Sequence, residues 1–183
     1  MDSILYETDR LRLRPLSYGD AELIEMYAGD YEVAKTTLNI PYPYPKGSAL
    51  DFIKATVESD KKGNSFSLAI TLQNDPAIIG LMGLSISQKH KRAELSYWIG
   101  KPYWGMGYGT EAAKMVMKIG FEQLDLHKIF AAAFTDNPAS WRIMEKVGMR
   151  EEGVFRQHVL KWDTFKDLSF YSILKSEYGE IHQ

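Results

Sequence analysis

The stretch YWGMGYGTEA, residues 103–112, places three glycines at alternate positions directly before an apolar helix. Glycine adopts backbone conformations that other residues resist, and it lets a ligand approach the main chain closely. The first amides of a helix are unpaired and lie at the positive end of its dipole, where they stabilise a phosphate. The stretch therefore predicts a turn from a strand into a helix that binds a phosphate group.

Three nucleotide-binding motifs differ from this stretch. A Rossmann fingerprint needs G-x-G-x-x-G in the first βαβ unit, whereas Gly105, Gly107 and Gly109 are evenly spaced and follow four predicted strands. A Walker loop needs a lysine after its glycines, and a kinase glycine loop joins two strands of a hairpin. A tight turn without a ligand stays open as the plain structural alternative.

Composition indicates one ordinary globular domain. The chain has 183 residues, of which 45% are hydrophobic and 25% charged, with a formal net charge of -2. This charge gives no electrostatic reason to expect nucleic-acid or membrane binding. The chain has no cysteine, which excludes disulfides and thiolate chemistry. The N-terminus lacks a signal-peptide pattern, and no window approaches about 20 apolar residues, so we expect a cytoplasmic protein.

The order of predicted elements indicates an α/β fold with a mixed, mostly antiparallel sheet of roughly seven strands. Three strands, at 66–72, 78–87 and 93–99, resemble an antiparallel meander. The glycine stretch then leads through a helix at 110–124 to a buried strand at 128–135, which is a βα crossover. The other predicted elements are a strand at 8–16, helices from 20, 48 and 136, and strands at 149–161 and 166–174.

The glycine stretch resembles the acetyl-CoA-binding motif [QR]-x-x-G-x-[GA] of the GCN5-related N-acetyltransferases (GNAT), with Trp104 in place of Gln or Arg. The form W-G-x-G-Y-[GA]-T-E-A resembles the RimJ/RimL-like branch, whose members acetylate ribosomal-protein N-termini and related amines. Four further segments are similar to that branch: ETDRLRLRPL (7–16), AELSYWIG (93–100), DNPASWRIMEKVGM (136–149) and FKDLSFYSIL (165–174). The resemblance implies one GNAT domain over 8–178, with terminal extensions at 1–7 and 179–183, helices on both sheet faces and a splay between the fourth and fifth strands.

The resemblance also implies a cofactor site for acetyl-CoA. Main-chain amides of the glycine stretch would hold the pyrophosphate, and free main-chain groups of the fourth strand would bind the pantetheine arm and polarise the acetyl carbonyl. Asn137 would bind the pantetheine, although it is also a good N-cap residue. The residues expected at this site are Trp98, Ile99, Gly100, Trp104, Gly105, Met106, Gly107, Tyr108, Gly109, Thr110, Asn137 and Ser140.

Two residues are candidates for catalysis. The resemblance places Ser140 beside the sulfur as proton donor to the leaving thiolate, a step for which many members use a tyrosine that this helix lacks. Glu94 is the candidate base, because it shares a strand face with Ser96 and Trp98; a solvated strand-end carboxylate is the alternative. The four histidines are scattered, so we expect no metal.

The acceptor is less constrained. Tyr42 and Tyr44, in the proline-rich segment IPYPYP (40–45), and His158 are candidate acceptor contacts, each with a plain structural alternative. An α-amine titrates near about 8 and needs less help than a lysine or polyamine. We therefore expect a protein or peptide N-terminal α-amine. A small-molecule amine (polyamine, antibiotic or amino acid) and a non-catalytic acyl-CoA-binding module are the alternatives, and the chain is expected to be a monomer or homodimer.

Overall fold

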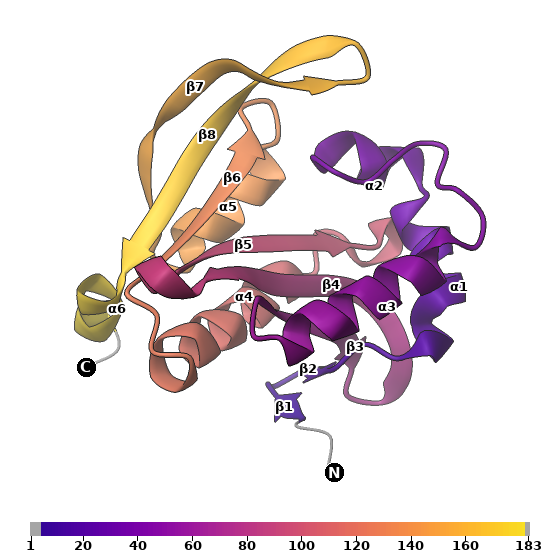
Figure 1. Cartoon of the computed structure of the whole chain (residues 1–183), viewed down its shortest axis with the longest axis horizontal. Coiled ribbons are helices and arrows are strands. Elements are labelled where there is room, and N and C mark those ends of the chain that lie inside the picture. Colours follow the sequence, from indigo (N-terminus) through magenta and orange to yellow (C-terminus); the bar gives the residue numbers. More distant parts are fainter. Residues whose placement is uncertain (1–4, 182–183) are drawn as a thin grey trace.

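The computed structural model describes residues 5–181, which form one mixed eight-stranded sheet with helices on both faces (Figure 1). The sheet order is β1-β2-β3-β4-β5-β6-β8-β7, and only the β5–β6 pair is parallel. The strands are β1 (Tyr6–Glu7), β2 (Leu11–Arg14), β3 (Ser65–Leu72), β4 (Asp75–Ser87), β5 (Arg92–Ile99), β6 (Lys128–Phe134), β7 (Arg150–Lys161) and β8 (Thr164–Leu174). The helices are α1 (Ala21–Ala28), α2 (Tyr31–Thr36), α3 (Ser48–Lys61), α4 (Tyr108–Lys118), α5 (Pro138–Lys146) and α6 (Lys175–Ile181).

The predicted fold class is confirmed, with local differences. The expected first strand is the short hairpin β1–β2, which makes eight strands in place of seven. Helix α2 was not predicted; the side chain of Asp30 caps it by accepting a hydrogen bond of 2.7 Å from the Glu32 amide. The helix at 48 begins after its N-cap Gly47, whose φ of 83° lies in the left-handed region. Residues 40–45 contain no helix or strand, as their prolines predict.

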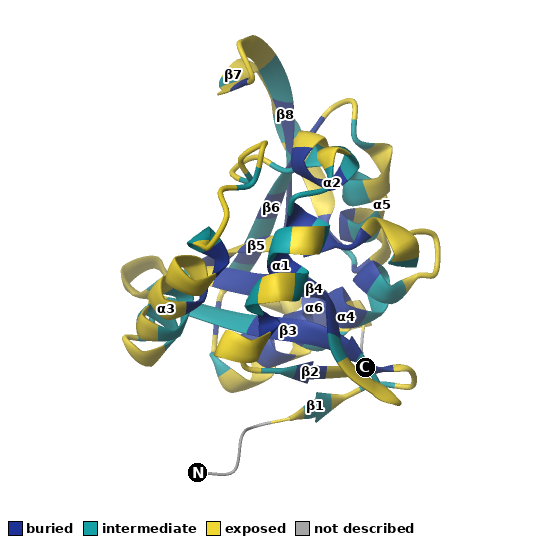
Figure 2. Cartoon of the chain, turned by 90° about the vertical axis from the view of Figure 1, so that its right-hand side faces the viewer, coloured by how far each residue is buried: buried dark blue, intermediate teal, exposed yellow. Residues whose placement is uncertain are grey.

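The sheet separates two hydrophobic cores. On one face α1 and α3 cover side chains such as Ala69, Ile78 and Leu81, and on the other α4 and α5 cover side chains such as Met82 and Leu84. In Figure 1, α3 crosses in front of the sheet and α4 lies behind it. Figure 2 shows the most deeply buried segments in the central strands, and the end of the β7–β8 hairpin exposed.

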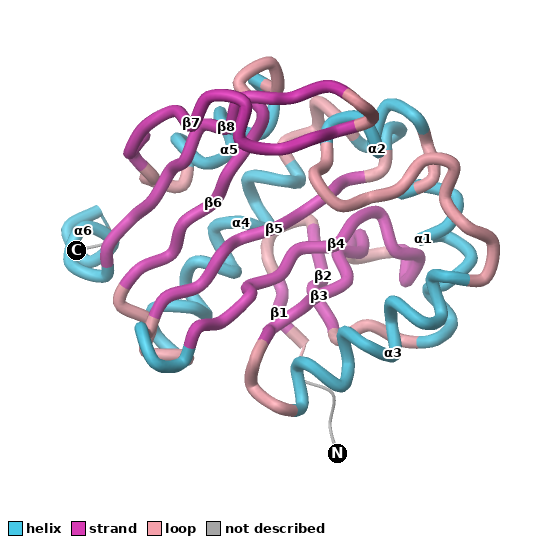
Figure 3. The backbone as a smooth tube through the Cα atoms, turned by 45° about the horizontal axis from the view of Figure 1, so that its top comes forward, coloured by secondary structure: helices cyan, strands magenta, loops and turns pink. Residues whose placement is uncertain are grey.

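The sheet opens between β5 and β6. These strands pair only from Arg92 to Glu94 with Lys128 to Phe130, and then diverge (Figure 3). On their outer sides, β4 pairs with all of β5 and β8 pairs with all of β6. The predicted splay is therefore present, and main-chain edges of both strands face each other across it without a strand between them.

Candidate functional site

Two cavities meet at the splay. The first, here named the loop cavity, measures about 430 Å³ and lies between the 103–110 loop, α5 and the end of β5. The second, here named the inner cavity, measures about 380 Å³ and lies between β5, β6 and the chain from α2 to Tyr44. Both are lined by Thr36, Thr37, Tyr97, Trp98 and Ser140, so a ligand in one cavity reaches a ligand in the other at these residues.

The predicted cofactor residues gather around the loop cavity. Gly100 and Met106 are the exceptions, because they lie beside the cavity rather than in its lining. The predicted residues that line it are Trp98, Ile99, Trp104, Gly105, Gly107, Tyr108, Gly109, Thr110, Asn137 and Ser140.

The three loop glycines serve two purposes. Gly105 and Gly107 have φ values of 76° and 81°, in the left-handed region that favours glycine. Gly107 is also the N-cap of α4, so its turn exposes the first amides of that helix to the loop cavity. Gly109 lies within α4, and a Cβ there would stand 2.8 Å from Cδ1 of Ile143. The third glycine therefore permits close packing of α4 on α5.

Arg10, in the turn between β1 and β2, holds the loop from outside. Its guanidinium donates to the Met106 carbonyl at 2.9 Å and to Glu111 at 2.7 Å, and it lies 4.8 Å from the Tyr108 ring centre. Burial opposes the charge of Glu111, but hydrogen bonds from Thr8 and from Arg10 outweigh it and lower the pKa of that carboxyl. This contact was not predictable from the sequence, because about a hundred residues separate its partners.

The Ile99 amide of β5 is directed into the splay. The Gly100 amide donates to the Ile79 carbonyl at 2.8 Å, on the β4 side, so it is already satisfied. Because N–H groups alternate along a strand, the Ile99 amide points the other way, toward β6. The Ile99 carbonyl on that side accepts from the Trp104 indole at 2.7 Å. Of the three predicted backbone contacts, Ile99 is therefore the one whose N–H is placed for a ligand.

Asn137 caps α5 and joins it to α2. Its Oδ1 accepts from the Ser140 amide at 3.3 Å, and its Nδ2 donates to the Thr36 carbonyl at 3.2 Å. Asn137 is therefore the N-cap of α5, the structural role that its residue type also predicts. An Asn amide has two N–H groups and two lone pairs, so one of each stays available to a ligand in the loop cavity.

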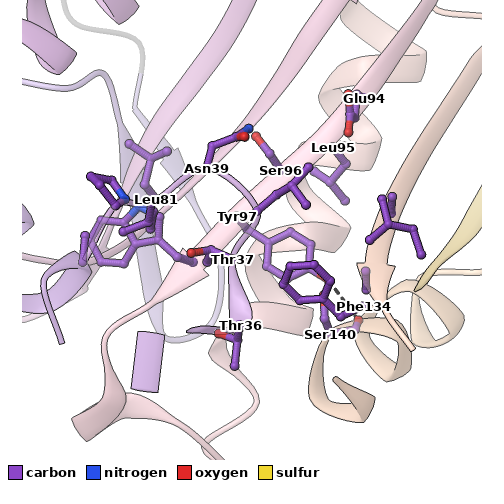
Figure 4. A pocket seen from close by; sticks show the side chains of 18 of the residues that line it. Thr36, Thr37, Asn39, Leu81, Glu94, Leu95, Ser96, Tyr97, Phe134 and Ser140 are labelled. Atoms are coloured by element: carbon purple, nitrogen blue, oxygen red, sulfur yellow. Dashed lines mark hydrogen bonds between the residues drawn. The ribbon is translucent and has the colours of Figure 1, made fainter. Parts of the chain in front are cut away.

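Two hydroxyl groups meet where the cavities join. The Tyr97 hydroxyl lies 2.9 Å from the Ser140 carbonyl, to which it donates, and 2.9 Å from Ser140 Oγ (Figure 4). Burial raises the pKa of Tyr97 to about 12, so this hydroxyl stays protonated at neutral pH. Helix α5 has no tyrosine, as the sequence indicates, and the tyrosine beside Ser140 is Tyr97 of β5, a contact that the sequence did not predict.

The inner cavity contains one carboxylate. Among its lining residues Glu94 is the sole acidic side chain; the residue is exposed overall, and partial desolvation of its carboxyl raises its pKa. Figure 4 shows Glu94 and Ser96 on one side of β5, with Asn39 opposite Ser96. Glu94 stands three residues from Tyr97 along the strand, or about 10 Å.

Of the three residues predicted to contact the acceptor, only one lines the inner cavity. Tyr44 lines the inner cavity. Tyr42 lies outside it, with its ring centre 5.2 Å from that of Tyr31. His158 packs between Phe155 and Phe170 in the β7–β8 hairpin and lines none of the cavities described here.

Residues 5–181 contain neither a grouped set of metal ligands nor a helix suited to a bilayer. In that range, no three His, Cys, Asp or Glu side chains are grouped so that they could hold a metal ion. The helices in the same range are all too short or too polar to cross a membrane.

The architecture and the site define a class of protein. Residues 10–150 match the family model described as the acetyltransferase (GNAT) domain, so the chain belongs to the GNAT family and is an N-acetyltransferase. It is 34% identical over 174 residues to the uncharacterized N-acetyltransferase YoaA of Bacillus subtilis, covering 93% of this chain and 97% of YoaA. A GNAT acetyltransferase from Bacillus anthracis has the same fold, with a TM-score of 0.84 at 24% identity over 94% of this chain and 99% of that one.

Two relatives bear names that state an acceptor. The putative ribosomal N-acetyltransferase YdaF of B. subtilis is 32% identical over 105 residues, 57% of each chain, which agrees with the RimJ/RimL-like branch. The spermidine N(1)-acetyltransferase of Escherichia coli is 28% identical over 145 residues, covering 78% of this chain and 74% of the enzyme.

Proposed function

We propose that the protein transfers the acetyl group of acetyl-CoA to the α-amine of a protein or peptide N-terminus. The observation that carries this proposal is the junction of two cavities at Tyr97, Trp98 and Ser140. A cofactor and an acceptor that enter from opposite cavities meet there, as direct transfer requires.

The loop cavity suits coenzyme A. The amides that open α4 after Gly107 would bind the pyrophosphate, with Arg142 and Lys146 of α5 on the same cavity wall. The pantetheine arm would run along the unpaired edge of β5 toward the junction, where Asn137 can bond it. The Ile99 amide would then donate to the thioester oxygen and stabilise negative charge as it develops.

The chemistry at the junction follows from direct attack. The neutral amine nitrogen attacks the thioester carbon, the carbon–sulfur bond breaks, and the sulfur leaves as a thiolate. The amine loses one proton to a base, and the thiolate gains one. A thiol titrates near about 8.5, well below a tyrosine whose pKa is about 12, so Tyr97 would keep its proton. Ser140 Oγ would stabilise the thiolate by donating a hydrogen bond, while Tyr97 donates to the Ser140 carbonyl and holds Ser140 in place.

Glu94 is the proposed base. It stands too far along β5 for direct contact with an amine at the junction, so water would carry the proton across the inner cavity. Its raised pKa makes it a better base than an ordinary carboxylate. An α-amine that titrates near about 8 requires only this modest help.

A small-molecule amine is the second candidate acceptor, and the similarity to a spermidine acetyltransferase favours it. The lining of the inner cavity argues for a peptide, because a polyamine has several cationic groups and Glu94 is the one acidic residue among the lining side chains. Thr36, Thr37 and Asn39 supply neutral polar groups of the kind that bond a peptide main chain.

An acceptor panel tests the proposal. Thiol release from acetyl-CoA is measured with peptides of free N-terminus, the same peptides with a blocked N-terminus, and spermidine. We expect turnover of the free peptides alone. Turnover of spermidine alone would overturn the acceptor assignment, and cofactor binding without turnover of any amine would indicate an acyl-CoA-binding module.

Gel filtration of the same preparation tests the expected monomer or homodimer.

A further inference from the structure

A third cavity lies next to the junction and carries the opposite charge to the inner cavity. It measures about 280 Å³ and lies between α2, the start of α5 and the end of the β7–β8 hairpin. Its charged side chains are Lys35, Lys161, Lys166 and Asp136, and we name it the lysine cavity. It shares Thr36 and Phe134 with the inner cavity, so a molecule can extend from one into the other.

Lys161 is buried without an acidic partner. Only 8% of the residue is exposed, and its Nζ donates to the Ile40 carbonyl at 2.9 Å and lies 4.7 Å from the Trp162 ring centre. Within residues 5–181, no carboxylate forms a salt bridge with it. Burial lowers its pKa, which reflects the cost of a cation held away from water. A buried cation of this kind is stabilised when an anion joins it.

The other two lysines have partners that an anion can replace. Lys166 pairs with Asp136 at 2.6 Å, and Lys35 pairs with Glu32 at 2.7 Å. Each of these four side chains is at least one-third exposed, so neither pair is strong. Three cations therefore surround a cavity whose lining includes one carboxylate, that of Asp136.

From this arrangement we infer that the lysine cavity binds an anionic group of the acceptor. The acceptor is then an amine that also carries a carboxylate or phosphate: the amine lies at the junction, where water links it to Glu94, and the anion lies beside Lys161. This inference rests on the proposed function and narrows it. It also disfavours polyamines, because the three lysines repel them.

Matched peptides test the inference. Three acceptors share one sequence and differ at the residue after the N-terminus, which is glutamine, glutamate or phosphoserine. We expect the wild-type protein to prefer an anionic peptide to the glutamine peptide by roughly tenfold in kcat/KM, mainly through KM. The ratio of kcat/KM for the glutamate peptide to that for the phosphoserine peptide shows whether the cavity prefers a carboxylate or a phosphate. Equal values for all three peptides would overturn the inference.

Variants separate anion binding from a structural role. Lys161→Met should remove the preference, and Lys161→Arg, which keeps a positive charge and N–H donors on an aliphatic stem, should retain it. Lys166→Gln, at a more exposed side chain, should reduce it. Lys89→Met, in the exposed turn between β4 and β5, is the control and should leave it unchanged. Equal losses for all three peptides in Lys161→Met would mean that Lys161 only braces the chain at Ile40.

A binding measurement separates this inference from the proposed function. The N-acetylated glutamate and glutamine peptides are titrated into the protein with coenzyme A by calorimetry. Tighter binding of the acetylated glutamate peptide supports the lysine cavity even where no peptide is turned over. Equal binding of the two overturns it even where peptides are good acceptors.

Discussion

Replacing Arg10 by methionine tests whether the cofactor loop is held in place from the β1–β2 turn. The change keeps most of the aliphatic stem and removes the guanidinium, which bonds the Met106 carbonyl, pairs with Glu111 and lies over Tyr108. The loop then loses its contact with the β1–β2 turn, while the Trp104 bond to the Ile99 carbonyl and the geometry of Gly105 and Gly107 are kept.

The cost follows from the exposure of the contacts. The Arg10 side chain is 48% exposed, so its ion pair contributes about 0.5 kcal/mol. The hydrogen bond to a main-chain carbonyl adds about 1 kcal/mol, and the contact with the Tyr108 ring about 0.5 kcal/mol. Together these amount to about 2 kcal/mol, which corresponds to a loss of coenzyme A affinity of up to roughly 30-fold if the loop must be ordered to bind.

Calorimetry with coenzyme A measures the loss, and a neighbouring arginine supplies the control. Arg12 lies two residues further along, in β2, and its guanidinium pairs with the Glu7 carboxylate at 2.8 Å. Arg12→Met should bind coenzyme A as the wild type does. Equal affinity of Arg10→Met and wild type, or an equal loss in both variants, would refute the reasoning, because the loop would then be held by its own turn.

Three further changes probe other parts of the site. Partial burial raises the folded-state pKa of Glu94, so the free energy of unfolding falls as pH rises from the unfolded pKa of about 4.3 through the folded pKa. Glu94→Gln should remove this fall, measured by urea denaturation at several pH values. The same variant should abolish the acidic limb of the pH profile of kcat/KM. Ser140→Ala should lower kcat by roughly tenfold with unchanged coenzyme A affinity, and full turnover would exclude Ser140 from the mechanism. Gly109→Val should lower the free energy of unfolding by about 1–3 kcal/mol, and a second change, Ile143→Ala, should recover part of the loss if the 2.8 Å approach is the cause.

The glycine loop that lines the loop cavity was predictable because its information is local. Alternate glycines before an apolar run indicate a turn into a helix, and the structure places Gly107 as the N-cap of α4. The prolines of residues 40–45 similarly exclude regular structure there. Each of these features depends on backbone chemistry within a few residues.

The junction was only partly predictable because its partners are distant in sequence. Alternation along β5 places Tyr97 on the face opposite Glu94, but nothing near Tyr97 indicates that the first turn of α5 covers that face. Helix α2 has six residues, too few for a hydrophobic period to appear. The lysine cavity depends on α2 and the hairpin end together, so no single stretch of sequence indicates it.

The position of Thr36 has a kinetic consequence. This last residue of α2 lines all three cavities, and its carbonyl accepts from Asn137 at the start of α5. A cofactor that shifts Asn137 therefore shifts the wall against which the acceptor rests. Substrate binding should then be synergistic, with the acceptor KM falling as acetyl-CoA approaches saturation, and because such coupling is reciprocal, a bound acceptor should tighten acetyl-CoA by the same factor.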